Sequence, residues 1–165
     1  MELPKRKPNR LSCFDYSTPG AYFLTICTQD KKCILGQIVG GGDLDAPQIS
    51  LSTIGKKVWR NIELSRQIPN IHVDKYLIMP NHIHLILFVD GTLVGGRSRS
   101  PSLTNAVVPH FVSTFKRFCH KDVGAKIFQR SYHDHVIRGE QDYLKIWEYI
   151  DNNPARWKED CFYEE

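Results

Sequence analysis

Two histidines stand two residues apart in an apolar segment, at positions 82 and 84 of the run PNHIHLILF. In an extended strand, residues two apart point to the same face, so His82 and His84 would lie side by side. Two neighbouring neutral imidazoles can bind one divalent metal ion. A chain with seven histidines can also contain this spacing by chance, which leaves a purely structural role open. The apolar setting favours a function, because burying a polar group without a partner is costly.

Other uses of a histidine pair match the sequence less well. Histidine-triad nucleotide hydrolases carry a third histidine two residues further on, where this chain has Ile86. A zinc hydrolase would need a third strong ligand, and no cysteine or carboxylate stands at a suitable spacing. A zinc-dependent phosphohydrolase acting on small nucleotides remains an alternative. It would retain zinc tightly and release a free product.

The second group of interest is a tyrosine on the polar side of the last expected helix. Tyr149 stands one turn from Lys145 and from Asn153, outside the apolar stripe of that helix. A phenol with a pKa near 10 attacks phosphorus slowly unless its proton is removed and the phosphate is polarised. A nearby cation would polarise the phosphate, and the amide oxygen of Asn153 could reach the same ion. The apolar stripe consists of Tyr143, Ile146, Trp147 and Ile150.

These residues need a sheet and helices to bring them together. The patterns predict the order strand, helix, strand, strand, helix, strand, helix, with a hairpin inserted after the first strand. This order predicts an α+β fold with a ferredoxin-like antiparallel sheet, helices on one face and the other face open. Nucleic-acid-binding proteins often use such an open face. The strands are expected at 21–28, 73–79, 82–89 and 127–132, the hairpin at 33–39 and 48–51, and the helices at 52–64, 103–120 and 142–153.

The length, the net charge and the cysteine content indicate the general class of protein. The 165 residues predict a single domain, 1–165, and a net charge of +4 permits a polyanionic partner without requiring one. Residues 1–12 are expected to form a basic arm and residues 91–102 a mobile basic loop. No apolar run is long enough to span a membrane, and no secretory signal is visible. Five cysteines without a C-x-x-C pair indicate reduced thiols in a cytoplasm.

Four segments, taken together and in this order, resemble the REP-associated tyrosine transposases. These proteins are relatives of the single-tyrosine insertion-sequence transposases within the HUH superfamily. The similarity extends over nearly the whole chain. The segments are YFLTICT at 22–28, MPNHIH at 79–84, FQRSYHDHVIR at 128–138, and the Tyr-Ile-x-x-Asn-Pro motif at 149–154.

The resemblance implies a metal-dependent endonuclease and strand transferase that acts on single-stranded DNA beside hairpin repeats. His82 and His84 match the residues that bind Mg²⁺ or Mn²⁺, and Tyr149 matches the nucleophile that forms a 5′-phosphotyrosine. Asn153 stands where the insertion-sequence relatives place a glutamine metal ligand, and its side chain is one methylene shorter. Phe128 replaces a tryptophan that is frequent in relatives. The loop at 91–102 and the short tail after Pro154 also depart from longer members.

The expected partner is single-stranded DNA with hairpin elements, bound by a monomer or homodimer associated with the nucleoid. Basic side chains on the arm, on the second helix and around the matching segments would contact this DNA. The main alternative is a domesticated, catalytically inactive module that only binds nucleic acid. The candidate DNA contacts are Lys5, Arg6, Lys116, Arg117, Arg130, His135, Arg138 and Lys145.

Overall fold

A computed structural model describes residues 18–41, 46–90 and 107–163 of the chain. The basic arm at 1–12 and the loop at 91–102 therefore lie outside the described residues. Within them, no helix combines the length and apolar character needed to cross a membrane.

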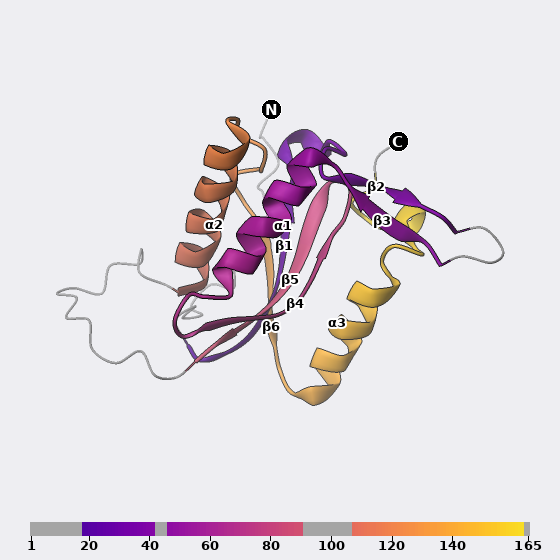
Figure 1. The fold of residues 1–165 in the computed structure, drawn as a ribbon. Coiled ribbons are helices and arrows are strands. Elements are labelled where there is room, and N and C mark those ends of the chain that lie inside the picture. Colours follow the sequence, from indigo (N-terminus) through magenta and orange to yellow (C-terminus); the bar gives the residue numbers. More distant parts are fainter. Residues whose placement is uncertain (1–17, 42–45, 91–106, 164–165) are drawn as a thin grey trace, which may run out of the picture.

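A four-stranded antiparallel sheet forms the centre of the molecule (Figure 1). Its spatial order is β4-β5-β1-β6, which is the ferredoxin-like arrangement predicted from the sequence. β1 lies between β5 and β6, and it pairs Thr25 with His84 and Cys27 with His82. The strands are β1 (Gly20–Cys27), β4 (Ile71–Ile78), β5 (His82–Val89) and β6 (His133–Ile137).

Two helices, α1 (Thr53–Ser65) and α2 (Val107–Val123), cover one face of the sheet (Figure 1). α1 begins where the Ser52 hydroxyl accepts a hydrogen bond from the backbone nitrogen of Gly55 at 3.0 Å. Its apolar stripe, including Val58 and Ile62, packs with α2 against the inward side chains of β1 and β5. This layer is the main hydrophobic core.

The third helix, α3 (Glu140–Asn152), lies on the opposite face of the sheet (Figure 1). There Ile150 is fully buried with Ile86 and Ile137 in a second, smaller core. Lys75 of β4 also bridges to the helix, with its ammonium 2.6 Å from Asp151 and 2.9 Å from the centre of the Trp147 ring. The face that the sequence left open is therefore partly occupied by the tyrosine helix itself.

The remaining elements are short. A separate hairpin of β2 (Gly36–Val39) and β3 (Gln48–Leu51) projects from the sheet. The 3-10 helix η1 (Gln29–Lys31) follows β1, and η2 (Trp157–Glu159) follows α3. In Figure 1 the hairpin and the yellow turn after α3 lie at the same end of the molecule.

One predicted strand was wrong. Residues 127–132 contribute only an isolated bridge between Thr28 and Phe128, and the fourth strand lies at 133–137. The error arose because Ile127, Phe128 and Tyr132 are buried in the main core although their backbone is irregular. The true strand is a polar edge strand, whose outward residues give no hydrophobic signal. The second helix begins at 107 in the described part and continues to 123, three residues beyond the prediction.

Candidate metal centre and tyrosine site

The two histidines of β5 are fully buried and lie with their rings together. Their Nε2 atoms are 2.9 Å apart. Two donors at right angles, each about 2.1 Å from one ion, would stand about 3 Å apart. The spacing of the two nitrogens therefore fits a pair of ligands to a single metal ion.

Each imidazole is oriented by a hydrogen bond at its other nitrogen. Nδ1 of His82 lies 2.9 Å from Oδ1 of Asn81, whose amide group donates in turn to the carbonyl oxygen of Phe162 at 2.7 Å. An amide oxygen only accepts, so Nδ1 of His82 carries the proton and its Nε2 presents a lone pair. Nδ1 of His84 lies 2.9 Å from the hydroxyl of Thr25, which can donate or accept.

Burial keeps both rings neutral. It lowers the pKa of His82 to about 4, although the nearby carboxylate of Asp160 acts in the opposite direction. Burial, followed by the proximity of His82, holds the pKa of His84 well below its ordinary value. Neutral imidazoles are the form that binds metal ions, so binding near pH 7 would release no proton from them. The proton of His84 would lie on Nδ1, where the hydroxyl of Thr25 can accept it.

A carboxylate that the sequence analysis did not single out completes the cluster. Asp160, His82 and His84 each offer one ligand atom, and these three atoms lie within 4.8 Å of one another. Asp160 accepts hydrogen bonds from Nδ2 of Asn153 at 2.6 Å and from the backbone nitrogen of Phe162 at 2.7 Å. This His-His-Asp cluster can bind a divalent metal ion.

Asn153 lies beside this cluster, because its Nδ2 atom donates to Asp160. Its side chain is 3% exposed, and its Oδ1 atom has no hydrogen-bond partner among the described residues. An unpaired buried oxygen is rare in a folded protein because the lost hydration is not replaced. Its position beside the cluster fits the ligand role predicted for Asn153.

Tyr149 lies next to the histidines in the same chain. The centre of its ring is 5.3 Å from that of His84 and 6.1 Å from that of Phe23. Its hydroxyl donates to Oδ2 of Asp160 at 3.2 Å, and the side chain is 41% exposed. Partial burial and the charge of Asp160 raise the pKa of the phenol above its ordinary value, so the hydroxyl is protonated at neutral pH.

The segment after α3 covers the histidines. The ring of Phe162 lies 4.9 Å from that of His82, and the ring of Trp157 lies 5.8 Å from it. Both imidazoles are fully buried, so one of the covering groups must move before a substrate phosphate can come close to them.

The candidate DNA contacts are distributed unevenly. Lys116 is 7% exposed, and its ammonium donates to the carbonyl oxygens of Gln129, Arg130 and Ser131 at 2.8, 3.3 and 2.8 Å. It therefore holds the irregular segment before β6, and its ammonium is turned away from solvent. Lys5 and Arg6 lie outside the described residues.

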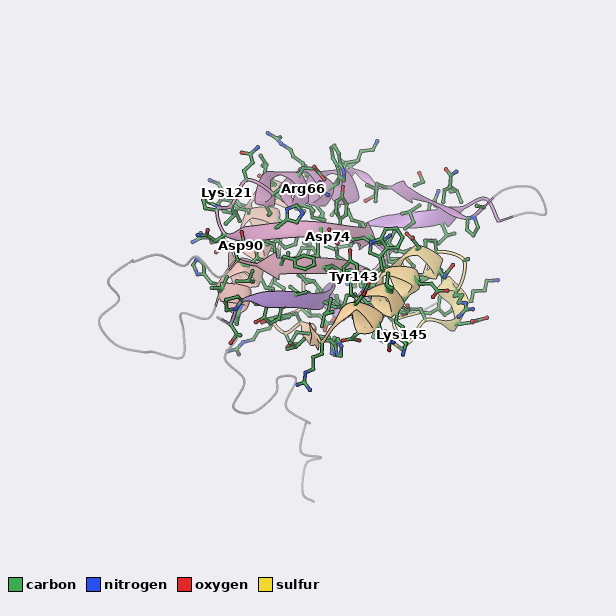
Figure 2. All side chains as sticks on the ribbon, turned by 90° about the horizontal axis from the view of Figure 1, so that it is seen from below. Arg66, Asp74, Asp90, Lys121, Tyr143 and Lys145 are labelled. Carbon is green, nitrogen blue, oxygen red and sulfur yellow. The ribbon has the colours of Figure 1, made fainter. Side chains whose placement is uncertain are left out.

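The other basic candidates are exposed: Arg117, Arg130, His135, Arg138 and Lys145. His135 contacts Asp142 at 2.8 Å, and Asp142 also accepts from the backbone nitrogen of Arg138. Lys145 and Tyr149 line the same hollow of about 480 Å³ on α3. Figure 2 shows Lys145 on the side of α3 away from Tyr143, whose hydroxyl donates to Asp74 of β4 at 2.7 Å.

Comparison with known proteins identifies the fold. No family model matches the chain. The fold is that of a REP-associated tyrosine transposase. The solved structure of one such protein, bound to a REP hairpin, superposes with a TM-score of 0.59 over 95% of this chain and 74% of that chain, at 17% identity. The resemblance predicted from the sequence is thus confirmed at the level of the fold.

A relative that is similar in sequence shows which protein family the chain belongs to. An uncharacterized protein of Haemophilus influenzae is 33% identical over 175 residues, which cover 96% of this chain and 93% of the relative. The chain belongs to the same protein family as this Haemophilus protein.

Proposed function

We propose that this protein cuts and rejoins single-stranded DNA at hairpin-flanked sites, with Tyr149 as the nucleophile. One observation carries the proposal: the Tyr149 ring lies 5.3 Å from a buried histidine pair, beside a carboxylate and an unpaired amide oxygen. A structural core would have no need for this combination of buried polar groups, since each of them loses hydration on folding.

The metal would be Mg²⁺ or Mn²⁺, held by nitrogens of His82 and His84 and by oxygens of Asp160 and Asn153. Such a mixture of nitrogen and oxygen donors is compatible with these ions. When bound, the ion supplies positive charge that polarises a phosphate.

The side chains of this chain account for the remaining chemistry. The Tyr149 oxygen forms a bond to phosphorus, the bond from phosphorus to the 3′ oxygen breaks, and that oxygen leaves as a 3′-hydroxyl after taking a proton from solvent. The phenol must lose its own proton during the attack. Oδ2 of Asp160 already accepts the hydrogen bond of this hydroxyl and is positioned to receive the proton. A 3′-hydroxyl can then attack the phosphotyrosine and join strands without ATP.

The alternative, an inactive nucleic-acid-binding module, is favoured by a different observation. Phe162 and Trp157 pack over the histidine pair and leave it no exposed surface. A module of this kind would bind hairpin DNA but would form no covalent intermediate.

One experiment separates the two functions. The protein is incubated with an oligonucleotide that carries a hairpin and single-stranded flanks, in Mg²⁺ or Mn²⁺, and run on a denaturing gel. We expect a shifted covalent band that is absent in Tyr149→Phe and in EDTA, while DNA binding persists in both. Binding without any covalent band in either metal would contradict the strand-transfer proposal and favour the module.

A further inference from the structure

The cleft between the β2–β3 hairpin and the segment after α3 is not assigned a role by the proposed chemistry. Its volume is about 650 Å³, within the range of about 300–1,000 Å³ that ligand sites usually have. Gly36 and Gln37 line its hairpin side, and Trp157 and Tyr163 line its C-terminal side. Figure 1 shows both walls at the same end of the molecule.

This cleft adjoins the hollow beside the nucleophile. Arg156 and Glu159 line both the cleft and the hollow of about 480 Å³ that contains Tyr149. The two spaces therefore lie side by side, with Arg156 and Glu159 forming part of the wall of each.

The groups in the cleft suit a single strand of nucleic acid. The rings of Trp157 and Tyr163 lie 5.3 Å apart with their planes nearly perpendicular, and both are partly exposed. Arg156 and Lys158 are exposed, and within residues 18–41, 46–90 and 107–163 neither cation has an ion-pair partner. Glu159 is the single carboxylate among the lining residues that the structure describes. Aromatic faces for bases and unpaired cations for phosphates are the features by which proteins hold single strands.

We propose that this cleft binds the single-stranded DNA next to the cut site, with Arg156 and Lys158 contacting phosphates and Trp157 and Tyr163 contacting bases. The inference rests on the proposed function, because it assigns to the cleft one flank of the DNA cut by Tyr149. It adds a binding site for the strand, whereas the histidine pair and Tyr149 account for the chemistry alone.

The test measures binding without cleavage. The double variant Arg156→Gln, Lys158→Gln is made in a Tyr149→Phe background and titrated in EDTA with a fluorescent DNA hairpin that carries single-stranded flanks. The same hairpin without flanks is the second probe. The control variant is Lys56→Gln, Arg60→Gln, which removes two exposed cations from α1 on the other face of the sheet.

We expect the cleft variant to bind the flanked DNA about tenfold more weakly and the bare hairpin unchanged. Its slope of log affinity against log salt should become less steep by about 1.4, since each single-strand phosphate contact contributes about 0.7. The control variant should change neither the affinity for either probe nor the dependence of the affinity on salt. An equal loss for both probes, or no loss for the flanked probe, overturns the inference.

A photocrosslink locates the strand independently of these variants. With 5-iododeoxyuridine in the flank, irradiation should attach the DNA to a peptide containing Trp157 or Tyr163. Attachment only to peptides of α1 or α2 overturns the inference. Both measurements are made without metal and without cleavage, so they test the cleft separately from the strand-transfer proposal. The cleft proposal can fail although the covalent band forms, and it can hold although no covalent band forms.

Discussion

Hydrogen bonds at single residues decide what the histidine pair can do. Asn81 is fixed by the backbone of Phe162, so its oxygen faces His82 and leaves the other nitrogen of that ring as an acceptor. One oxygen of Asp160, Oδ2, accepts hydrogen bonds from both the amide of Asn153 and the hydroxyl of Tyr149. In the proposed chemistry the metal ion and the nucleophile therefore share a carboxylate, which gives Asp160 a testable role in each.

We expect Asp160→Asn to weaken Mn²⁺ binding by about tenfold or more, since it removes the charged oxygen donor with little change in shape. Titration followed by calorimetry or by the electron spin resonance of Mn²⁺ measures this affinity without DNA. Glu159→Gln is the matched control, because this exposed neighbour lies outside the cluster. Equal affinities of Asp160→Asn and the unmodified protein would remove Asp160 from the ligands.

The buried imidazoles also predict how stability changes with pH. An unfolded chain takes up a proton at each histidine near pH 6.5, while in the folded chain His82 resists protonation until about pH 4. The unfolded state therefore binds more protons in this window, and the free energy of unfolding should fall as the pH is lowered through it. For His82 alone the loss is about 3 kcal/mol.

Urea unfolding at several pH values between 7 and 4.5, in EDTA, measures how the free energy of unfolding changes with pH. The double variant His82→Gln, His84→Gln should show a clearly shallower decline, whatever its stability at pH 7. A decline as steep as that of the unmodified protein would mean that the imidazoles are not held neutral by the fold.

At the scale of elements, the position of α3 decides whether Tyr149 reaches the histidines. Ile150 anchors the helix in the small core, and Lys75 holds it through Asp151 and Trp147. At the start of the helix, Asp142 accepts from the backbone nitrogen of Arg138. These contacts are few compared with those of α1 and α2, so α3 is expected to be the helix that opens most easily.

We expect Ile150→Ala to remove about 3 kcal/mol of local stability from α3, as large-to-small changes in a core usually do. Hydrogen exchange read by mass spectrometry should show faster exchange in 140–152, with α1 nearly unchanged. Leu144→Ala on the exposed side of the same helix is the control. An equal rise of exchange in α1 and α3 would show instead that α3 unfolds together with the rest of the molecule as one cooperative unit.

Particular elements show how far the sequence could predict this molecule. The strand at 82–89 and the helix at 52–64 were predicted within a residue, because their periodicity is strong and their ends carry Pro80-Asn81 and Ser52. The edge strand β6 was missed because its residues are mostly polar. The docking of α3 on the second face depends on long-range contacts, such as that of Lys75 with Asp151, which no local pattern contains.

Some residues of the candidate site could be predicted from the sequence and others could not. His82, His84, Tyr149 and Asn153 have local signatures, namely alternation in a strand and a position off the apolar stripe of a helix. Asp160 has none, because its position depends on the turn that η2 makes after α3. Lys116 looked like a surface cation by helical spacing, yet its ammonium turns inward to three carbonyl groups.

At the scale of the whole molecule, one chain contains every group of the proposed site. The histidines come from β5, Asp160 from the C-terminal segment and Tyr149 from α3, all in contact without a second copy. We therefore expect that mixing Tyr149→Phe with His82→Gln, His84→Gln yields no covalent DNA adduct. Recovery of the adduct in the mixture, seen on a denaturing gel, would show that helices exchange between subunits.

The most direct test of the strand-transfer account identifies the residue that carries DNA. After incubation with flanked hairpin DNA and Mn²⁺, the protein is digested with nuclease and protease, and the modified peptide is sequenced by mass spectrometry. We predict a nucleotide attached through a 5′ phosphate to Tyr149, within the peptide that continues to Asn153. A nucleotide on Tyr143 or Tyr132, or no modified peptide in any divalent metal, would contradict the account.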